Sequence, residues 1–214
     1  MSQQKKPLII IGSGGHAKVV INVARVLEWP ILGITEANQE KINKDFLGIS
    51  VIGLDDKVFN YSPEEVQLVN AIGSIKSSLK RKVIFDTFKA KGYQFATLVH
   101  PSAIIAQRVE IDEGAQIMAG AIIQPDACIG SNSIINTGAI IEHDCKISKH
   151  VHIAPGVVIS GNVIVGANTH IGVGAKIIQS VKIGTSCTVA AGAVVTKNVE
   201  DDSLVMGVPA KTIR

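Results

Sequence analysis

The residues best suited to chemistry lie in one stretch, GAIIEHDCKISKHVHIAPG, which spans residues 138 to 156 and holds three of the six histidines. His143 stands there between the carboxylates of Glu142 and Asp144. Histidine exchanges a proton near neutral pH, and a neighbouring carboxylate fixes its tautomer and the orientation of its ring. We therefore predict that His143 acts as a general base and that Asp144 orients it.

A second group of candidate residues follows the first apolar run of the chain. The segment GSGGHA has the pattern G-x-G-x-x-A, starting at Gly12, and Glu36 follows about 20 residues further on. Glycines at the start of a helix let backbone amides approach a phosphate. The pattern predicts a nucleotide site and leaves an NAD-dependent dehydrogenase open. Against a dehydrogenase, this half lacks a second mononucleotide unit and a catalytic set for hydride transfer.

Composition and charge exclude several classes of protein. The net charge is +3 with 18% charged residues, and no basic run of 5 to 8 residues appears, so we expect no nucleic-acid partner. Three cysteines without a CxxC pair predict neither a disulfide framework nor a zinc knuckle. The first apolar run is too short for a signal peptide, and none approaches the roughly 20 residues of a membrane span. We expect a cytoplasmic protein with no membrane partner.

The N-terminal half alternates between strand and helix patterns. Aliphatic runs predict strands at residues 7–11, 31–35 and 66–73, and helical spacing predicts helices at 17–27 and 77–92. Such alternation is typical of a small parallel α/β sheet. We therefore predict a Rossmann-like domain over residues 1–99.

From Ala103 onward the sequence repeats every six residues. Sixteen consecutive blocks run to Asn198 without an insertion, and the third residue of every block is Ile or Val. The first residue is always small or β-branched. This period is typical of a parallel β-helix in which three blocks close one triangular coil of about 18 residues. We predict a β-helix domain over residues 100–214, with coils stacked about 4.8 Å apart.

The repeat also predicts which residues stack on one another. His143 is the fifth residue of its block and lies on a turn, and Gly161 holds the same place one coil along. A histidine ring next to bare backbone leaves a slot in which a substrate atom can approach. A base that takes a proton, beside a backbone N–H that stabilises an oxyanion, suits acyl transfer.

The other histidines of this region and two cysteines have simpler explanations. His152 and His170 are second residues of blocks one coil apart, and His150 precedes His152, so we expect them in solvent or in subunit contacts. Cys145 and Cys187 are first residues and are expected in the core. A zinc site built from the three histidines stays open as an alternative, as in the gamma-class carbonic anhydrases that this half resembles in architecture. Zinc would need all three ligands to converge with help from a neighbouring subunit.

Four motifs together resemble a known family over essentially the whole chain. They are IIIGSGGHAKVV near the start, TLVHPSA at the join, NTGAIIEHD in the repeat and MGVPAK near the end. They are similar to the bacterial acyltransferases typified by sialic acid O-acetyltransferase, which include nucleotide-sugar N-acetyltransferases. The resemblance implies a homotrimer of left-handed β-helices, with acetyl-CoA between adjacent subunits and a nucleotide-sugar on the N-terminal domain.

The resemblance also implies roles for individual residues. His143 matches the general base, Asp144 its acidic partner, and Asn136 a residue on the sugar side of the site. The implied cofactor contacts are His152 and the amides of Gly161, Val173 and Ala191. The implied nucleotide-sugar contacts are Gly12, Ser13, Gly14, His16, Glu36 and Gly73. The family commonly has two acids after the second strand, whereas here Ala37 follows Glu36, which leaves the identity of the bound base open.

The sequence therefore predicts an acetyl-CoA-dependent N-acetyltransferase that acts on a nucleotide-linked 4-amino-4,6-dideoxy sugar in polysaccharide biosynthesis. We expect direct attack by the amine and no metal. An O-acetyltransferase acting on sialic acid or a related sugar hydroxyl remains open, because a hydroxyl needs the same base. A non-catalytic trimeric nucleotide-sugar-binding protein is a further alternative, although the presence of both His143 and Gly161 favours an enzyme.

Overall fold

The computed structural model describes residues 5–74 and 79–213. Packing of the Cα trace divides the chain into two compact units. The N-terminal unit comprises Met1–Gly73 and Val83–Ala96, and the repeat unit comprises Ser74–Lys82 and Thr97–Arg214. Helix α2 (Leu79–Lys89) passes from the repeat unit into the N-terminal unit. None of the helices within the described residues is long and apolar enough to cross a membrane.

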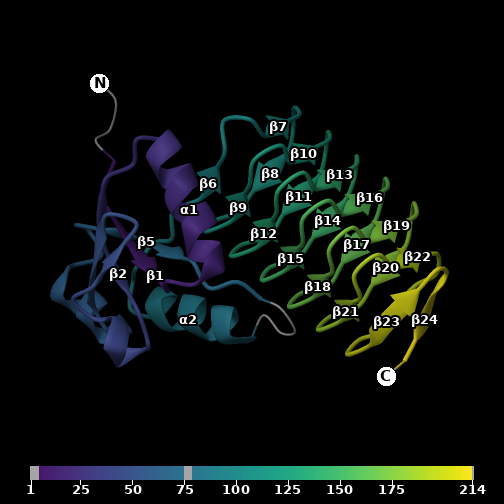
Figure 1. Cartoon of the computed structure of the whole chain (residues 1–214). Helices are drawn as coiled ribbons and strands as arrows, with labels where there is room; N and C mark the ends of the chain where they lie inside the picture. The colour runs from purple at the N-terminus through teal and green to yellow at the C-terminus, as the bar shows by residue number, and fades with distance from the viewer. Residues whose placement is uncertain (1–4, 75–78, 214) are drawn as a thin grey trace. The chain divides into compact units, whose positions relative to one another are not determined.

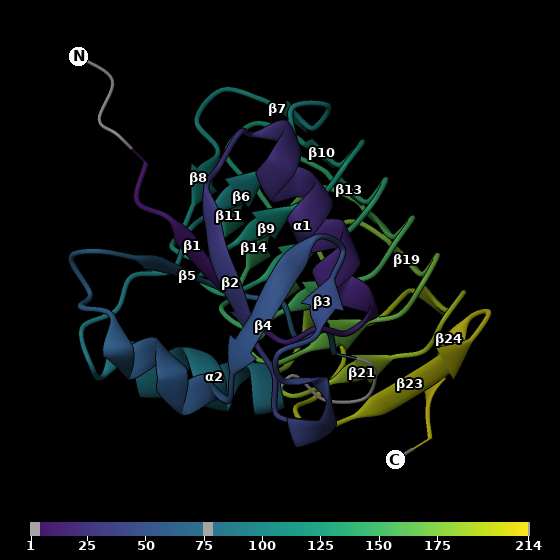
Figure 2. The same ribbon diagram turned by 60° about the vertical axis from the view of Figure 1, so that its left-hand side comes forward.

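The N-terminal unit is built around a five-stranded sheet in the order β3-β4-β2-β1-β5. Its elements besides α2 are β1 (Leu8–Ile11), α1 (Gly15–Val26), β2 (Ile31–Thr35), η1 (Gln39–Lys41), β3 (Asp45–Phe46), β4 (Ile49–Gly53), η2 (Asp55–Asn60) and β5 (Gln67–Asn70). All neighbouring pairs are parallel except β3 with β4. Every residue of β1 is fully buried, as expected of a central parallel strand. Figure 2 shows β2 and β4 side by side next to β1. The predicted α/β sheet is confirmed.

One part of this sheet was missed by the sequence pattern. Strands β3 and β4 form a hairpin in which Leu47 and Gly48 both have positive φ, of 57° and 77°. Two such residues make the tight turn that suits a two-residue hairpin. The pattern at residues 45–53 was too short to be recognised, because β3 has only two residues. The helix predicted over 77–92 is confirmed as α2, although residues 77 and 78 lie outside the described part of the chain.

The repeat unit is a stack of short strands in three sheets, and all of them are parallel to their neighbours except β24, which is antiparallel to β23 (Figure 1). The first sheet holds β7 (Ile104–Ile105), β10 (Ile122–Ile123), β13 (Ile140–Ile141), β16 (Val158–Ile159), β19 (Lys176–Ile177) and β22 (Val194–Val195). The second holds β8 (Glu110–Ile111), β11 (Cys128–Ile129), β14 (Lys146–Ile147), β17 (Ile164–Val165) and β20 (Lys182–Ile183). The third holds β6 (Leu98–Val99), β9 (Gln116–Ile117), β12 (Ile134–Ile135), β15 (His152–Ile153), β18 (His170–Ile171), β21 (Thr188–Val189), β23 (Leu204–Gly207) and β24 (Ala210–Thr212).

The interior of the repeat unit follows the six-residue period. Each two-residue strand consists of the second and third residues of a six-residue block. The second residue faces outward and the third faces inward. Ile141, Ile159 and Ile177 stack directly on one another in the first sheet, each 2% exposed or less. Cys145 and Cys187 are buried in the same core, as predicted from their first positions. The predicted β-helix is therefore confirmed.

The two ends of the repeat depart from the regular period. At the start, Leu98 and Val99 already pair with Gln116 and Ile117, so the stack begins one block earlier than Ala103. At the other end, Leu204 pairs with Thr188, an offset of 16 residues in place of 18. The last coil is thus shorter by two residues in the segment after β22. The β23–β24 hairpin then ends the stack.

Candidate functional site

His143 lies on the turn between β13 and β14, and its side chain is 61% exposed. The Nδ1 atom lies 2.8 Å from Oδ2 of Asp144. Asp144 has a φ of 61°, and this left-handed turn conformation brings its carboxylate back to the adjacent ring. With Nδ1 engaged by the carboxylate, Nε2 is the ring nitrogen left for a substrate. The orientation expected of a general base with its acidic partner is present.

Gly161 lies against the free side of this ring, as the repeat predicts. The amide of Asn162 donates to the carbonyl of His143 at 2.9 Å, so the two turns stack directly. A Cβ atom at Gly161 would lie 2.6 Å from both Cε1 and Nε2 of His143. The φ angle of Gly161 is not positive, so its backbone conformation does not require glycine. Glycine is needed here because the ring of His143 leaves no space for a side chain. The slot beside Nε2 exists because this residue has no side chain.

The carboxylate raises the basicity of the ring. The hydrogen bond that Nδ1 donates to Asp144 raises the pKa of His143 above its usual value. Desolvation opposes this rise, and the charges of Asp144 and Glu142 add to it. The imidazolium that forms when Nε2 takes a proton is therefore stabilised in place. A histidine in this state is suited to accept a proton from a weakly acidic group.

A second polar cluster lies on the third sheet of the repeat unit. The Nδ1 atom of His152 lies 2.8 Å from Oγ and 3.0 Å from the carbonyl oxygen of Ser74. The Nε2 atom lies 3.2 Å from Nδ2 of Asn136. The ring of His170 packs edge-on against that of His152, with centroids 5.0 Å apart, and burial lowers the pKa of His170. Asn136 and His152 are thus brought together, with Ser74 and His170 beside them.

The sequence predicted that His152 and His150 lie in solvent or in subunit contacts, but both are buried within one copy of the chain. His152 is 8% exposed because Ser74 covers it, and His150 is 2% exposed. The Nδ1 atom of His150 lies 2.9 Å from Nδ2 of Asn132, itself fully buried. Asn132 in turn meets the backbone and guanidinium of Arg81 in α2. The cause is that Ser74 contacts His152 and that Arg81 contacts Asn132, the partner of His150.

The two parts of the candidate site lie at different corners of the β-helix. We call the turns after β10, β13, β16, β19 and β22 the His143 corner, and the turns after β9, β12, β15, β18 and β21 the Asn136 corner. His143 and Gly161 lie on the first, and Asn136, Val173 and Ala191 on the second. The whole first sheet separates the two corners. One copy of the chain therefore does not bring His143 together with Asn136 and His152.

The glycine-rich segment and Glu36 meet at the carboxyl edge of the N-terminal sheet. Gly12 follows β1, Glu36 follows β2 and Gly73 lies just after β5. These strands are neighbours in the order β2-β1-β5, and the order reverses at β1. In open α/β sheets, ligands bind in a crevice outside the carboxyl ends of the strands, at the point where the strand order reverses. The residues predicted from the motif thus lie at the expected edge.

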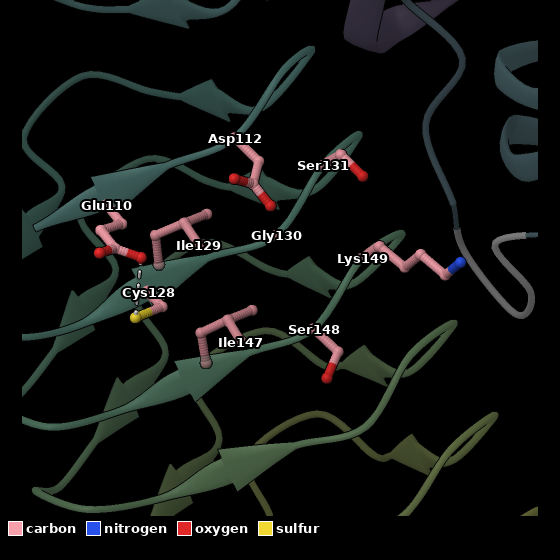
Figure 3. Close-up of a pocket in the computed structure, with 9 residues that line it drawn as sticks. All are labelled: Glu110, Asp112, Cys128, Ile129, Gly130, Ser131, Ile147, Ser148 and Lys149. Carbon is pink, nitrogen blue, oxygen red and sulfur yellow. Dashed lines mark hydrogen bonds between the residues drawn. The ribbon is translucent and has the colours of Figure 1, made fainter. Parts of the chain in front are cut away.

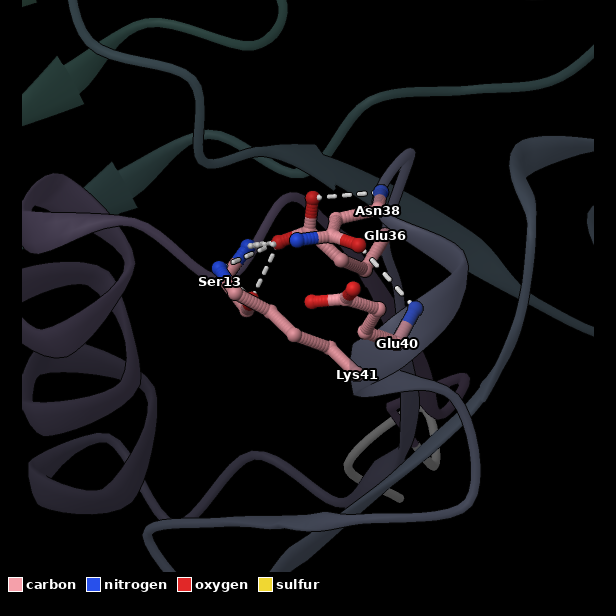
Figure 4. Close-up of polar contacts among 5 residues, drawn as sticks. All are labelled: Ser13, Glu36, Asn38, Glu40 and Lys41. Carbon is pink, nitrogen blue, oxygen red and sulfur yellow. Dashed lines mark hydrogen bonds and ion pairs between the residues drawn. The ribbon is translucent and has the colours of Figure 1, made fainter.

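Glu36 holds the first turn of this loop through its carboxylate. Oε2 accepts hydrogen bonds from the amide and hydroxyl of Ser13, and Oε1 accepts one from the amide of Asn38 at 3.1 Å. Lys41 lies 3.3 Å from both Oε2 of Glu36 and Oγ of Ser13. Figure 4 shows these side chains converging. Burial acts to raise the pKa of Glu36. The hydrogen bonds from Ser13, Asn38 and Lys41 outweigh this effect and lower the pKa to about 2.

The glycines and His16 shape the same loop. Gly12 has a φ of 98°, and a Cβ there would lie 3.1 Å from Ile72, so both conformation and space require glycine. Gly14 precedes α1 and is open to solvent on its Cα side, with His16 in the first turn of the helix. A Cβ at Gly73 would lie 3.3 Å from that of His16, so the turns after β1 and β5 touch.

A hollow of about 340 Å³ opens on the outward side of the second sheet, away from both corners described above. It lies beside Glu110, Asp112, Cys128 and Lys149, and Figure 3 shows Lys149 pointing away from the two carboxylates. The thiol of Cys128 lies 3.7 Å from Oε2 of Glu110. Burial and this carboxylate raise the pKa of the thiol. A protonated thiol is a poor nucleophile, so the hollow does not form a cysteine site.

Among residues 5–74 and 79–213, no group of three or more His, Cys, Asp or Glu side chains is placed to hold a metal ion. His150, His152 and His170 do not converge on one point, because His150 turns to Asn132 while His152 turns to Ser74. The zinc arrangement left open by the sequence is therefore not formed in one copy of the chain.

Sequence patterns missed two contributors. Ser74 follows Gly73 in a segment with no recognisable motif, so its contact with His152 could not be foreseen. Lys41 lies in the short helix η1 (Gln39–Lys41), and its distance of five residues from Glu36 is no signal by itself.

Two family descriptions match parts of the chain. Residues 7–88 match the PglD N-terminal domain. Residues 120–149 and 162–197 match the hexapeptide repeat of succinyl-transferase. The first match falls on the sheet that carries the glycine-rich loop, and the second falls on the β-helix. No curated protein sequence matches the chain closely enough to count as a relative.

Several solved structures are similar over the whole chain. PerB from Caulobacter crescentus, solved with CoA and GDP-perosamine, is 35% identical with a TM-score of 0.90, and the match covers 100% of both chains. The same GDP-perosamine N-acetyltransferase was solved with both ligands after one histidine was replaced by alanine. The acetyltransferase domain of PglB from Neisseria gonorrhoeae, solved with acetyl coenzyme A, is 32% identical with a TM-score of 0.89 over 98% of this chain and 100% of that one.

A third structure, WeeI from Acinetobacter baumannii, is 26% identical with a TM-score of 0.86 over 98% of this chain and 100% of that one. The two family descriptions follow each other along this chain in the order of its two units. The similarity to PerB extends over the full length of both chains at 35% identity, which is enough to assign the family. The chain belongs to the sugar acetyltransferases of the left-handed β-helix family.

Proposed function

We propose that the protein transfers an acetyl group from acetyl-CoA to the amine of a nucleotide-linked 4-amino-4,6-dideoxy sugar. The observation that carries this proposal is the slot at the His143 corner, where Nε2 of a carboxylate-held histidine faces the bare backbone of Gly161. The similarity to an enzyme solved with CoA and GDP-perosamine supports this pair of substrates.

The reaction follows from the contents of the slot. The amine nitrogen forms a bond to the thioester carbonyl carbon, and its proton passes to Nε2 of His143. The oxyanion of the tetrahedral intermediate is stabilised by the amide of Gly161. The carbon–sulfur bond then breaks, the carbonyl re-forms as an amide, and the proton on His143 passes to the departing CoA thiolate. Asp144 stabilises the imidazolium between these two transfers.

A covalent route through cysteine is disfavoured by the environment of all three thiols. Burial raises the pKa of Cys145 to about 11 and also raises that of Cys187, while burial and Glu110 raise that of Cys128. Nucleophilic cysteines have lowered pKa values, since the thiolate is the reactive form. Direct attack by the amine therefore remains the simplest mechanism.

For the nucleotide half of the substrate we propose the carboxyl edge of the N-terminal sheet. Gly12, Ser13 and Gly14 would present backbone amides to the phosphates at the start of α1. His16 and Gly73, which touch each other, would line the same crevice. Glu36 would bind the ribose, for which it has to exchange a hydrogen bond from Ser13 or Lys41.

We further propose that the active form is a homotrimer. His143 and Asn136 lie on opposite edges of the first sheet, so a second copy is needed to place the Asn136 corner, with Val173 and Ala191, beside the His143 slot. The outward residues of that sheet support packing against another copy, because all but Lys176 are aliphatic. They are Ile104, Ile122, Ile140, Val158, Lys176 and Val194. Burying such a stripe is favourable in water.

Three further features of the proposal rest on the chain as a whole. Residues 1–99 are proposed as the nucleotide-sugar-binding domain and residues 100–214 as the acetyltransferase domain. A cytoplasmic location is proposed because acetyl-CoA is made there and the three cysteines are unpaired, as is usual in a reducing compartment.

Transfer of the acetyl group to a hydroxyl, as in sialic acid O-acetylation, is the second candidate reaction, since a hydroxyl would use the same histidine.

The function is tested by thiol release from acetyl-CoA with a panel of acceptors. The panel contains GDP-, UDP- and dTDP-linked 4-amino-4,6-dideoxy sugars, each paired with its 4-hydroxy analogue and with free sialic acid. We expect release of CoA only with amino sugars, and with one nucleotide preferred. Release with hydroxyl acceptors alone would favour the O-acetyltransferase, and binding of nucleotide-sugar without any release would favour a non-catalytic protein.

Filling the slot is expected to abolish transfer while the protein stays folded. In Gly161→Val the new Cβ would lie 2.6 Å from Nε2, so the exposed His143 ring must swing out of position. We expect turnover to fall by at least about 10²-fold, the lower end of what a general base supplies. The measurement is the initial rate at saturating acetyl-CoA, together with calorimetric binding of the nucleotide-sugar, which should not change.

The matched control is Pro125→Val, which alters the same turn position one coil below His143. This variant should keep the wild-type rate. A Gly161→Val protein whose rate lies within about twofold of wild type would place the slot elsewhere, since loss of oxyanion stabilisation alone costs far more.

The pH dependence of the rate should follow the raised pKa of His143. A general base works only when unprotonated, so kcat/KM should rise with pH through a pKa above 6.5, the usual value for histidine. In Asp144→Asn the partner that raises this pKa is lost. The rising limb should then move to lower pH, and the plateau should fall because the ring is no longer held.

Asp126→Asn provides the comparison for this profile. Asp126 occupies the same turn position one coil below and pairs with Arg108 instead of a histidine. Its pH profile should match that of the wild type. A rising limb that stays in place in Asp144→Asn would show that another group is the base.

A further inference from the structure

The Asn136 corner carries a chain of hydrogen bonds that begins at a backbone amide and ends at a backbone carbonyl. The amide nitrogen of Thr137 lies 2.8 Å from Oδ1 of Asn136. The Nδ2 atom of Asn136 lies 3.2 Å from Nε2 of His152, whose Nδ1 lies 3.0 Å from the carbonyl oxygen of Ser74. A backbone amide can only donate, and a carbonyl oxygen can only accept. The two ends therefore fix the direction of every hydrogen bond between them.

The direction at Asn136 follows from the amide of Thr137. Because this N–H must meet an acceptor, the atom that faces it is Oδ1, and the atom that faces His152 is Nδ2. The Nδ2 group only donates, so Nε2 of His152 accepts and carries no proton. The proton of the neutral ring is then on Nδ1, where the carbonyl oxygen of Ser74 accepts it. The contacts thus select one of the two tautomers of His152.

The hydroxyl of Ser74 extends the chain to His170. Its Oγ lies 2.8 Å from Nδ1 of His152 and 3.4 Å from Nδ1 of His170. Since Nδ1 of His152 carries the proton, Oγ accepts from it, and the hydroxyl hydrogen is left to donate to His170. Burial lowers the pKa of His170, which stabilises the neutral ring that can accept at Nδ1. The two rings also pack edge-on, so Ser74 and His170 together hold His152 in place.

The amide of Asn136 keeps one hydrogen for a ligand. Its Oδ1 accepts from both the amide and the hydroxyl of Thr137, at 2.8 and 3.4 Å. Over residues 5–74 and 79–213, the hydrogen-bond partner of Nδ2 is Nε2 of His152 alone. The side chain is half-buried, so a ligand can reach it. Asn136 therefore meets a ligand as a donor, and the group that it recognises is an acceptor oxygen and not an ammonium group.

We propose that Ser74 and His170 are positioning residues of the transfer site. They hold His152 with its proton on Nδ1, His152 holds the amide of Asn136, and Asn136 donates its second amide hydrogen to a hydroxyl oxygen of the amino sugar. This assignment rests on the proposed function, in which a second copy brings the Asn136 corner beside the His143 slot. It adds a basis for selecting the sugar, because the corner binds an oxygen and leaves the amine to His143.

The kinetic test compares Ser74→Ala with Ser74→Thr, which keeps the hydroxyl. In Ser74→Ala we expect KM for the amino sugar to rise about two- to tenfold, as for the loss of one hydrogen bond between neutral groups. The value of kcat and the KM for acetyl-CoA should stay nearly unchanged, because the ring of His143 is not touched. Ser74→Thr should return KM for the sugar to the wild-type value. A merely structural role of Ser74 would not separate the two KM values.

Ser102→Ala is the matched control. Its Oγ lies 2.8 Å from Nδ1 of His100, the same pair of atoms at the same distance as in Ser74 and His152. This pair lies two coils below Asn136, about 10 Å along the β-helix axis. The control should leave every KM unchanged.

The tautomer is read directly by NMR of protein labelled with ¹⁵N in its histidine rings. Protonated and unprotonated ring nitrogens differ in chemical shift, and the signals of His152 are identified by their loss in His152→Gln. We expect the wild type to carry its proton on Nδ1 alone. In Asn136→Asp the carboxylate can only accept, so Nε2 should become protonated, and KM for the sugar should rise at least about tenfold.

Two results would overturn the assignment while the proposed function stands. One is a wild-type His152 ring protonated on Nε2, and the other is a Ser74→Ala protein that releases CoA with an unchanged KM for the sugar. A wild type that transfers no acetyl group would overturn the proposed function instead. The NMR spectrum and calorimetric binding of the sugar to the same variants would then still decide the roles of Ser74 and His170.

Discussion

His143→Ala is expected to fold and assemble like the wild type and to lose about 10²–10⁴-fold in turnover, the usual share of a general base. The side chain is 61% exposed on a turn, so its removal leaves no cavity in the core. Its loss removes the acceptor of the amine proton and the imidazolium that Asp144 stabilises. The measurement is kcat at saturating concentrations of both substrates, with the melting temperature recorded on the same protein.

His100→Ala is the matched control for this result. His100 also lies on a turn of the repeat unit, and its Nδ1 atom interacts with the amide and hydroxyl of Ser102. The control should keep wild-type turnover. A His143→Ala protein with nearly wild-type kcat would remove this histidine from the mechanism, and a large drop in its melting temperature would show that the residue is structural.

Ile159→Asp is expected to prevent folding of the repeat unit. Ile159 is fully buried and stacks between Ile141 and Ile177. A carboxylate at this place has no partner within the aliphatic core, and burying such a group costs several kcal/mol in addition to the lost apolar contacts. The total is comparable with the whole stability of an ordinary domain, about 5–15 kcal/mol. Thermal unfolding followed by circular dichroism measures the effect.

Lys146→Asp provides the comparison on the outward side of the second sheet. Lys146 is exposed and directly precedes Ile147, which is buried in the same core. This change should alter the stability by no more than about 0.5 kcal/mol, as is usual for surface substitutions. An Ile159→Asp protein that melts like the wild type would show that third residues of the repeat do not face the core.

The fold could be predicted almost completely because its pattern is local and periodic. The recurring Ile or Val at every sixth residue identifies the inward positions without knowledge of any long-range contact. For the same reason the stacking of Gly161 on His143 could be read from their spacing of one coil. The structure adds the reason for glycine at this place: its φ is not positive, and a side chain there would collide with the ring of His143.

The parts that could not be predicted depend on segments far apart in the sequence. His152 occupies an outward position, and nothing near it in the chain shows that Ser74 will cover it. His150 is buried for a similar reason, since Asn132 and the segment around Arg81 close over it. The two-residue shortening of the last coil after β22 was also missed, because nothing in the six-residue period signals it.

The central claim is tested most directly by the structure of the product. The wild-type protein is incubated with acetyl-CoA and the preferred nucleotide-linked 4-amino-4,6-dideoxy sugar, and the product is analysed by mass spectrometry and by NMR of the C4 position. We predict one added acetyl group per sugar, joined to the C4 nitrogen as an amide, and none when His143→Ala replaces the wild type under the same conditions. An acetyl ester on a sugar oxygen, or unchanged sugar with intact acetyl-CoA, would contradict the account.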